Sequence, residues 1–198
     1  MAKADRSARV SRKTQETAVE LSLALDGTGK TEIASPVGFL NHMLALFGRH
    51  ALVDLAVKAT GDVDVDLHHT VEDIGILLGQ ALDKALGDKA GITRFASVAV
   101  PMDESLVEVA LDLSGRPFLA YNVTFPGERI GDFETQLVQE FLQAVVNHAK
   151  MTLHVNLAYG SNDHHIAEAV FKAFARALKA AIAVDPRVSG TPSTKGVL

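Results

Sequence analysis

The sequence carries the same uncommon motif twice. His68-His69-Thr70-Val71-Glu72 has the pattern His-His-x-x-Glu, and the pattern returns 96 residues later as His164-His165-Ile166-Ala167-Glu168. A second copy is improbable by chance. Any fold for this chain must therefore explain how two such motifs come to lie in equivalent places.

The segments around the two motifs also align with each other. Residues 19–27 match 107–115 at an offset of 88, and residues 40–57 match 138–155 at an offset of 98. In the second block His42 aligns with Glu140, and His50 aligns with His148. Small changes of offset fall where loops are expected, since loops tolerate insertions. A unit of this length is too long for a solenoid repeat, so we expect two pseudo-symmetric halves.

Hydrophobic periodicity gives each half the order βββαβα. Alternating apolar residues predict strands at 19–25, 30–34, 54–59, 95–101, 105–113, 117–123 and 151–157, with a looser alternation from residue 8. Helical spacing predicts helices at 36–48, 68–87, 133–149 and 164–183, and residues 124–132 are expected to form a loop.

The expected fold class is α+β. Each half is expected to be a two-layer α/β sandwich, with a four-stranded sheet that carries two helices on one face. We place the first half at 1–91, the second at 92–184 and a tail at 185–198, all within a single structural unit.

Composition excludes several classes of function. The formal charge of −5 argues against a general nucleic-acid binder, and the absence of cysteine excludes disulfides, thiol nucleophiles and thiolate metal ligands. No apolar run approaches the ~18 residues that a membrane span needs. The basic N-terminal segment 1–14 lacks the apolar stretch of a secretory signal. We therefore expect a cytoplasmic protein.

The paired motifs indicate a metal site. On a helix, Glu72 shares a face with both His68 and His69, but neighbouring histidines point about 100° apart. One helix therefore offers its two histidines more naturally to two metals, or to a metal and a substrate. His42 is the natural addition, and its repeat mate Glu140 is a further candidate ligand. Imidazole and carboxylate without thiolate suit manganese, iron, zinc, cobalt or nickel.

Basic residues form a second set of candidates. Arg94, Arg116, Lys172 and Lys195 lie at strand or loop starts, on the second motif helix and in the tail. Ser193-Thr194-Lys195-Gly196 offers hydroxyl groups, a cation and flexible backbone, which suit a phosphate group. Neither a G-x-x-x-x-G-K-[ST] loop nor a G-x-G-x-x-G fingerprint occurs, so a nucleotide site is not indicated.

The motifs together resemble the imidazoleglycerol-phosphate dehydratase family of histidine biosynthesis, over essentially the whole chain. The matching stretches are Thr14–Thr17, Leu25–Gly29, Phe39–Leu44, Asp66–Asp73, Pro101–Glu104, Thr152–His154, His164-His165, Phe171–Ala173 and Pro192–Gly196. The resemblance implies a duplicated two-layer fold, a homo-oligomer of 24 subunits, and two manganese(II) ions in each active site, built where subunits meet.

The resemblance also assigns residues. It implies metal ligands at His42, His68, His69, Glu72, His164, His165 and Glu168, and a phosphate clamp at Arg94, Arg116, Lys172, Ser193 and Lys195. Glu16 matches a carboxylate that contacts the substrate. His42 is also expected to contact the substrate. The candidates for the general acid or base are Glu16, Glu72 and Glu168.

Two positions depart from the family pattern. Asn41 stands where much of the family has aspartate, which is expected to change the support of His42. Glu140 stands where many members have histidine, so either Glu140 or His148 is left to complete the second metal shell. We favour Glu140, because it is the repeat mate of His42.

The implied reaction is loss of water from D-erythro-1-(imidazol-4-yl)glycerol 3-phosphate, which gives 3-(imidazol-4-yl)-2-oxopropyl phosphate. Two rival interpretations fit the residues. One is a dinuclear metallohydrolase that acts on another small phosphorylated substrate. The other is a non-catalytic assembly in which the histidines and metals only join subunits.

Overall fold

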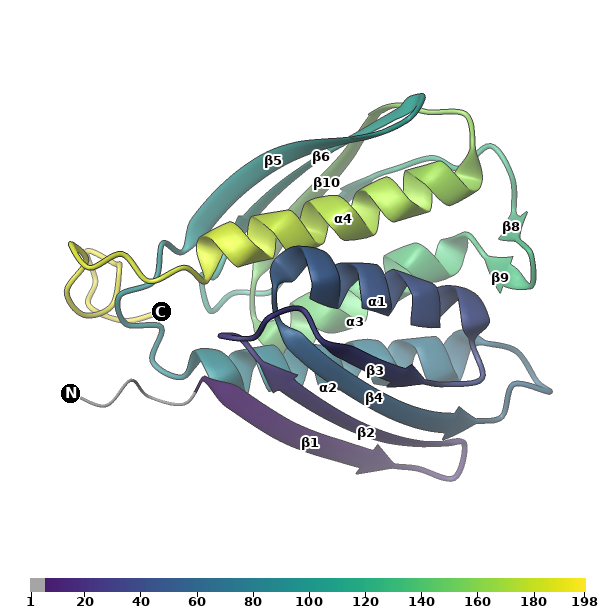
Figure 1. Cartoon of the computed structure of the whole chain (residues 1–198), viewed down its shortest axis with the longest axis horizontal. Coiled ribbons are helices and arrows are strands. Elements are labelled where there is room, and N and C mark those ends of the chain that lie inside the picture. The colour runs from purple at the N-terminus through teal and green to yellow at the C-terminus, as the bar shows by residue number, and fades with distance from the viewer. Residues whose placement is uncertain (1–5) are drawn as a thin grey trace.

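Two four-stranded sheets enclose a layer of helices (Figure 1). The computed structural model describes residues 6–198, so positions 1–5 of the basic N-terminal segment lie outside the described residues. The first half contains β1 (Ser7–Lys13), β2 (Thr17–Ala24), β3 (Thr31–Ala34), α1 (Gly38–Ala51), β4 (Asp54–Gly61) and α2 (His68–Leu86). The second half contains β5 (Phe95–Met102), β6 (Ser105–Asp112), β7 (Phe118–Asn122), β8 (Arg129–Ile130), β9 (Phe133–Glu134), α3 (Gln136–Ala149), β10 (Thr152–Tyr159) and α4 (Asp163–Ala181).

The two sheets have the same topology. Their strand orders are β1-β2-β4-β3 and β5-β6-β10-β7, and in each sheet only the last pair is parallel. The repeat offsets reappear in the element bounds. β2 and β6 begin 88 residues apart, at Thr17 and Ser105, and α1 and α3 begin 98 apart, at Gly38 and Gln136. The predicted α+β fold, a duplicated βββαβα half with two helices on one face of each sheet, is confirmed.

Helices from opposite halves pack against each other between the sheets. α2 covers β1 and β2, and α4 covers β5 and β6. Across the middle, α1 packs on α4 and α2 packs on α3 (Figure 1). Phe47 and Phe174 meet there with ring centroids 5.3 Å apart.

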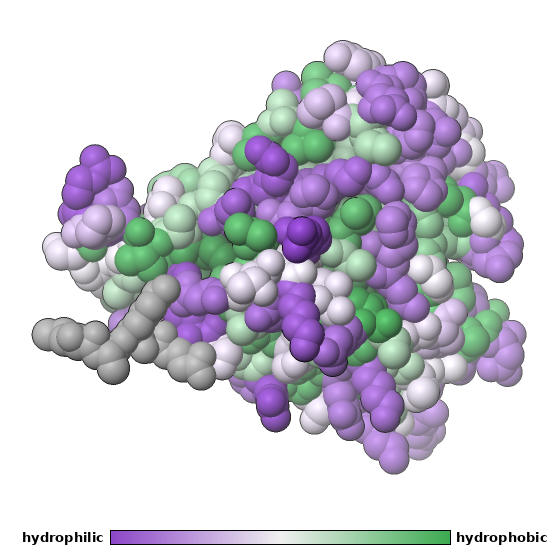
Figure 2. All heavy atoms as spheres, in the orientation of Figure 1, coloured by the Kyte–Doolittle hydropathy of each residue, from purple (hydrophilic) through white to green (hydrophobic). Residues whose placement is uncertain are grey.

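The outer surface, seen in the orientation of Figure 1, is mostly hydrophilic, with small apolar patches (Figure 2).

Residues 124–135 differ from the sequence prediction. This stretch, expected as a loop followed by a helix from residue 133, contains the short ribbon β8–β9, and α3 begins only at Gln136. Phe133 is buried because its ring packs on Phe39, with centroids 5.0 Å apart, and not because it lies on the apolar face of a helix. Thr135 holds the ribbon closed, since its hydroxyl donates to the Gly127 carbonyl oxygen at 3.0 Å.

Asn41 stabilises the turn before α1. Its side-chain oxygen accepts from the Ser35 hydroxyl at 2.6 Å, and its amide nitrogen donates to the Ser35 carbonyl at 2.8 Å. The Asn41 amide is therefore occupied by Ser35 rather than by the ring of His42.

Among the described residues, no helix is long and apolar enough to cross a membrane.

The tail returns to the linker between the halves. The Asp185 amide donates to the Gly91 carbonyl at 2.9 Å, and the Gly91 amide donates to the Gly190 carbonyl at 2.8 Å. These bonds place the end of the chain beside Arg94, at the start of β5.

The close contact of α2 with α3 depends on glycine. A Cβ atom at Gly79 would lie 2.6 Å from the Val145 carbonyl oxygen and 2.7 Å from the His148 Cβ, whereas one at Gly38 would meet no atom within 4 Å. We expect Gly79→Ala to lower the free energy of unfolding by about 1–3 kcal/mol, as overpacking does.

Gly38→Ala is the matched control. It adds the same methyl group to a helix, without a clash, and should leave stability unchanged or raise it by up to about 1 kcal/mol. Urea unfolding of both variants measures the difference. Equal effects at the two positions would contradict the close helix contact.

Candidate metal and phosphate sites

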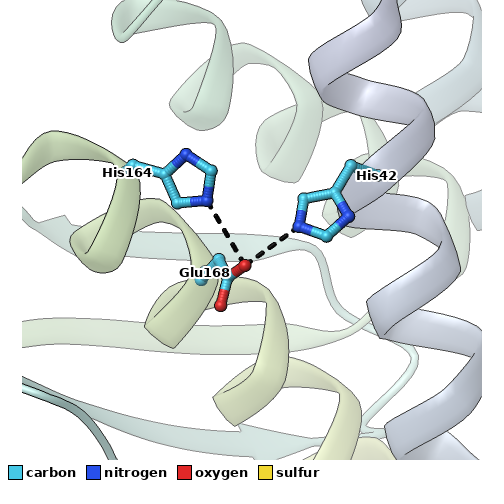
Figure 3. Close-up of side chains that lie close together, drawn as sticks. All are labelled: His42, His164 and Glu168. Carbon is cyan, nitrogen blue, oxygen red and sulfur yellow. Dashed lines mark hydrogen bonds and ion pairs between the residues drawn. The ribbon is translucent and has the colours of Figure 1, made fainter.

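Three predicted ligands converge at the contact between α1 and α4. His42 projects from α1, and His164 and Glu168 project from the first turns of α4 (Figure 3). The Glu168 Oε1 atom lies 2.9 Å from His42 Nε2 and 3.3 Å from His164 Nε2. The three ligand atoms lie within 4.8 Å of one another, which is close enough for a single cation to bind all of them.

Glu168 is held as an anion. Its side chain is only 9% exposed, and its second oxygen accepts from Lys172 Nζ at 2.5 Å. Burial opposes ionisation, but the hydrogen bonds from Lys172, His42 and His164 outweigh it, and the pKa of Glu168 falls to about 2. This carboxylate therefore needs no deprotonation to bind a cation near neutral pH.

The second histidine of the α4 motif meets other partners. His165 Nδ1 lies 2.7 Å from Glu104 Oε2, while His164 turns toward Glu168. The two rings lie 6.3 Å apart and nearly perpendicular. The neighbouring histidines therefore serve different contacts, as the helical geometry predicts.

The α2 motif repeats this arrangement. His68 and His69 have centroids 6.2 Å apart and are nearly perpendicular. His69 Nδ1 lies 3.0 Å from Asp62 Oδ2 and 3.9 Å from Glu16 Oε2. Side-chain hydrogen bonds to Asp62 and Glu104 raise the pKa values of His69 and His165 respectively.

The sequence interpretation missed Asp62 and Glu104. Glu104 could have been found, because it is the repeat mate of Glu16 at the offset of 88. Asp62 has no such signal, because the aligned position in the second half is Gly160.

A cavity of about 860 Å³ adjoins the cluster. It lies between the start of α1, the loop before α2 and the β8–β9 ribbon. His42, His68 and His164 line it, together with Phe39 and Asp66. The cavity therefore joins the first histidine of each motif to His42.

Other predicted ligands lie outside the cluster. Glu72 is exposed on α2, and Glu140 is exposed on α3, where His148 is half-buried. Among residues 6–198, the cluster that could hold a metal through one chain contains only His42, His164 and Glu168. The structure of one chain thus brings together three of the eight predicted ligands.

The basic candidates form a separate hollow of about 530 Å³. It is lined by Arg94, Arg116, Ser193 and Lys195, together with Pro192, Thr194, Val197 and Leu198. Asp112 anchors Arg94 through two hydrogen bonds of 2.7 and 3.1 Å, and the Pro192 carbonyl accepts from Arg94 at 2.8 Å.

The hollow and the histidine cluster lie at opposite ends of α4. The Arg94 amide donates to the carbonyl of Ala181, the last residue of α4, whereas His164 is in the first turn (Figure 1). The 17 residue steps from His164 to Ala181 span about 25 Å at 1.5 Å per residue. Lys172, which pairs with Glu168, lies apart from the other predicted phosphate ligands.

Comparisons with known proteins give a consistent family. A family model described as imidazoleglycerol-phosphate dehydratase matches residues 35–178. Proteins with that name from Geobacter sulfurreducens and Methylorubrum populi are 58% and 59% identical to this chain. Each alignment covers 98% of the chain, and 99% and 100% of the respective relative.

Solved structures agree. The crystal structure of imidazoleglycerol-phosphate dehydratase from Staphylococcus aureus superposes with a TM-score of 0.83 at 41% identity, over 90% of this chain and 99% of that one. The crystal structure of IGPD from Pyrococcus furiosus in complex with (S)-C348 gives a TM-score of 0.82 at 36% identity, over 96% and 100% of the two chains.

The low pKa of Glu168 makes stability depend on pH. Because the pKa falls from its ordinary 4.5 to about 2 on folding, the ionised carboxylate stabilises the fold above pH 4.5. This contribution is lost as the pH falls from 4.5 toward 2. In chelator-treated protein, we expect the difference in unfolding free energy between wild type and Glu168→Gln to shrink over that range.

Urea titrations at a series of pH values measure this difference. Glu20→Gln, on the exposed face of β2, is the control and should show little difference at any pH. A Glu168→Gln difference that stays constant from pH 5 to pH 2 would contradict the assignment.

Proposed function

The chain belongs to the imidazoleglycerol-phosphate dehydratase family and is a hydro-lyase of histidine biosynthesis, and on that premise we propose that it works with two Mn²⁺ ions in active sites shared between subunits. The observation that carries this proposal is the convergence of His42 Nε2, His164 Nε2 and Glu168 Oε1 at one point.

The donor set fits a divalent cation of this kind. Two imidazoles and one ionised carboxylate, without sulfur, suit Mn²⁺. Under the proposal, His42, His164 and Glu168 hold one ion from this chain. The remaining ligands, His68, His69, Glu72, Glu140 and His165, serve as donors that neighbouring chains bring together. A bound cation supplies Lewis-acid stabilisation of negative charge on the substrate imidazole.

The reaction removes one hydroxyl group and one proton. The substrate loses the hydroxyl group on the carbon attached to the ring and the hydrogen on the next carbon. The resulting enol becomes the 2-oxo group when a proton returns to the carbon beside the ring. The protein must therefore orient the chain of the substrate and move a proton to and from neighbouring carbons.

Glu16 is the carboxylate best placed to move that proton. Its side chain is 56% exposed in the turn between β1 and β2, and it stands 3.9 Å from the ring of His69. Glu168, by contrast, is fixed by Lys172 and two imidazoles, so it suits binding. Glu72 is exposed on α2, one turn past His68, where it suits metal binding and is a weaker candidate for the acid or base.

The length of α4 supports a site shared between copies. Arg94, Arg116, Ser193 and Lys195 supply cations and a hydroxyl for a phosphate, but about 25 Å of helix separates them from His164. A three-carbon phosphate ester is far shorter than this distance. Under the proposal, the phosphate hollow of one copy therefore serves the histidine cluster of another.

Exposed aromatic residues also favour self-association. Phe95 and Phe118 lie on the outer face of the second sheet and are 56% and 58% exposed. His154 contacts Phe118 there, with centroids 6.0 Å apart. Covering this face with another copy would remove apolar area from water. The homo-oligomer of 24 subunits and the cytoplasmic location stay predictions.

The proposed activity predicts a specific product. With Mn²⁺, the protein should convert imidazoleglycerol phosphate to 3-(imidazol-4-yl)-2-oxopropyl phosphate, and His164→Ala should lower kcat/KM by more than about 100-fold because a metal ligand is lost. Chromatography of the product and an assay for inorganic phosphate measure the outcome. Release of phosphate without the oxo product would favour the metallohydrolase, and turnover that persists without any metal would contradict the proposed cofactor.

Shared sites predict complementation. Glu168→Gln damages the histidine cluster and Arg116→Gln damages the phosphate hollow, so each variant alone should be nearly inactive. Dissociating and reassembling an equal mixture should restore about a quarter of wild-type activity, because random pairing joins an intact cluster to an intact hollow at one site in four. Restoration that fails, although mass measurements show mixed oligomers, would contradict the shared site.

A further inference from the structure

Glu16 and Glu104 are repeat mates with different surroundings. They occupy the matching turns β1–β2 and β5–β6, at the offset of 88, and each stands beside the second histidine of a motif. Repeat mates in a duplicated chain begin with the same environment. The contacts that each carboxylate now makes therefore show how the two halves have diverged.

Glu104 is fixed by three donors. Its Oε2 atom lies 2.7 Å from His165 Nδ1, and its Oε1 atom accepts from the backbone N–H of Asn162 at 3.0 Å and from the Ser105 hydroxyl at 2.9 Å. Asn162 caps α4, since its side chain accepts from the amides of His164 and His165. Glu104 therefore joins the start of β6 to the first turn of the motif helix.

In the first half Asp62 makes the contact with the second histidine that Glu104 makes in the second half. Its Oδ2 atom lies 3.0 Å from His69 Nδ1, closer than Glu16 at 3.9 Å. Its other oxygen is buried and has no hydrogen-bond partner among the described residues, so His69 is the contact that this carboxylate makes. The loop that supplies Asp62 has six residues before α2, whereas the equivalent loop before α4 has three and begins with Gly160.

We infer that Glu104 is a positioning residue that orients His165 for metal binding, and that Asp62 does the same for His69, which leaves Glu16 free to act on the substrate. An ionised carboxylate only accepts hydrogen bonds. His165 Nδ1 must then carry the ring proton, and Nε2 keeps the lone pair that a metal needs. The nearest acid to that Nε2, Asp103, is 3.8 Å away and 72% exposed, so it does not occupy the nitrogen.

This inference rests on the proposed metal site, and Glu104→Gln tests it. A glutamine has one acceptor oxygen in place of two. If that oxygen keeps the bond from the backbone N–H of Asn162, the NH₂ group of the glutamine faces His165 Nδ1 and favours the histidine tautomer with the proton on Nε2. That tautomer cannot bind a metal through Nε2.

Electron paramagnetic resonance of free Mn²⁺ measures the binding. The wild type should bind two ions per chain, and Glu104→Gln should weaken one of them by about 10–100-fold. Asp62→Asn should also weaken binding of one ion, and it serves as the second variant if Glu104→Gln does not fold. Glu16→Gln should keep both affinities within about twofold while kcat falls. Glu108→Gln, on the outer face of β6, should change neither quantity.

Each outcome decides the question. Mn²⁺ affinities of Glu104→Gln and Asp62→Asn equal to those of wild type would overturn the positioning role while leaving the proposed function intact. A comparable loss of Mn²⁺ in Glu16→Gln would overturn the division between the two repeat mates. A wild type that binds no Mn²⁺ would overturn both the cofactor and this inference.

Discussion

The packing of α1 against α4 joins the halves of the chain and builds the histidine–glutamate cluster in the same contact. Phe47 and Phe174 anchor the two helices in the core, and His42 meets Glu168 along the same seam. A site that depends on one helix from each half cannot form until both halves are folded and docked. The hydrophobic contact therefore sets the geometry that the polar residues use.

Duplication explains both the symmetry of the molecule and its departures from symmetry. The element bounds repeat at offsets of 88 and 98, so each motif helix starts beside the same strand turn. Function then separates the copies. His42 contacts Glu168 in the cluster, whereas its mate Glu140 lies outside it. Glu104 lies 2.7 Å from His165 Nδ1, whereas its mate Glu16 stands 3.9 Å from His69 Nδ1. Such divergence suits an asymmetric small substrate, which presents a ring at one end and a phosphate at the other.

Periodicity and the repeat predicted the fold, because buried faces must recur at fixed spacing whatever the loops do. The same reasoning failed at Phe133, where an apolar residue fills a ribbon contact instead of a helix face. At the site, the helix angle between His164 and His165 was predictable, whereas Asp62 was not, because its position depends on the course of a loop. The separation of Arg94 from His164 by the length of α4 could be recognised only from the fold, since both residues match one family site in the sequence.

Anomalous scattering from crystals of the Mn²⁺-loaded protein tests the central claim most directly. The account predicts two metal peaks per chain, one of them among His42 Nε2, His164 Nε2 and Glu168 Oε1, with ligands from a neighbouring copy completing the shells. It also predicts that the nearest phosphate hollow to this peak belongs to another copy. A fully occupied crystal with no peak at the cluster, or with every ligand and the phosphate hollow from one chain, would contradict it.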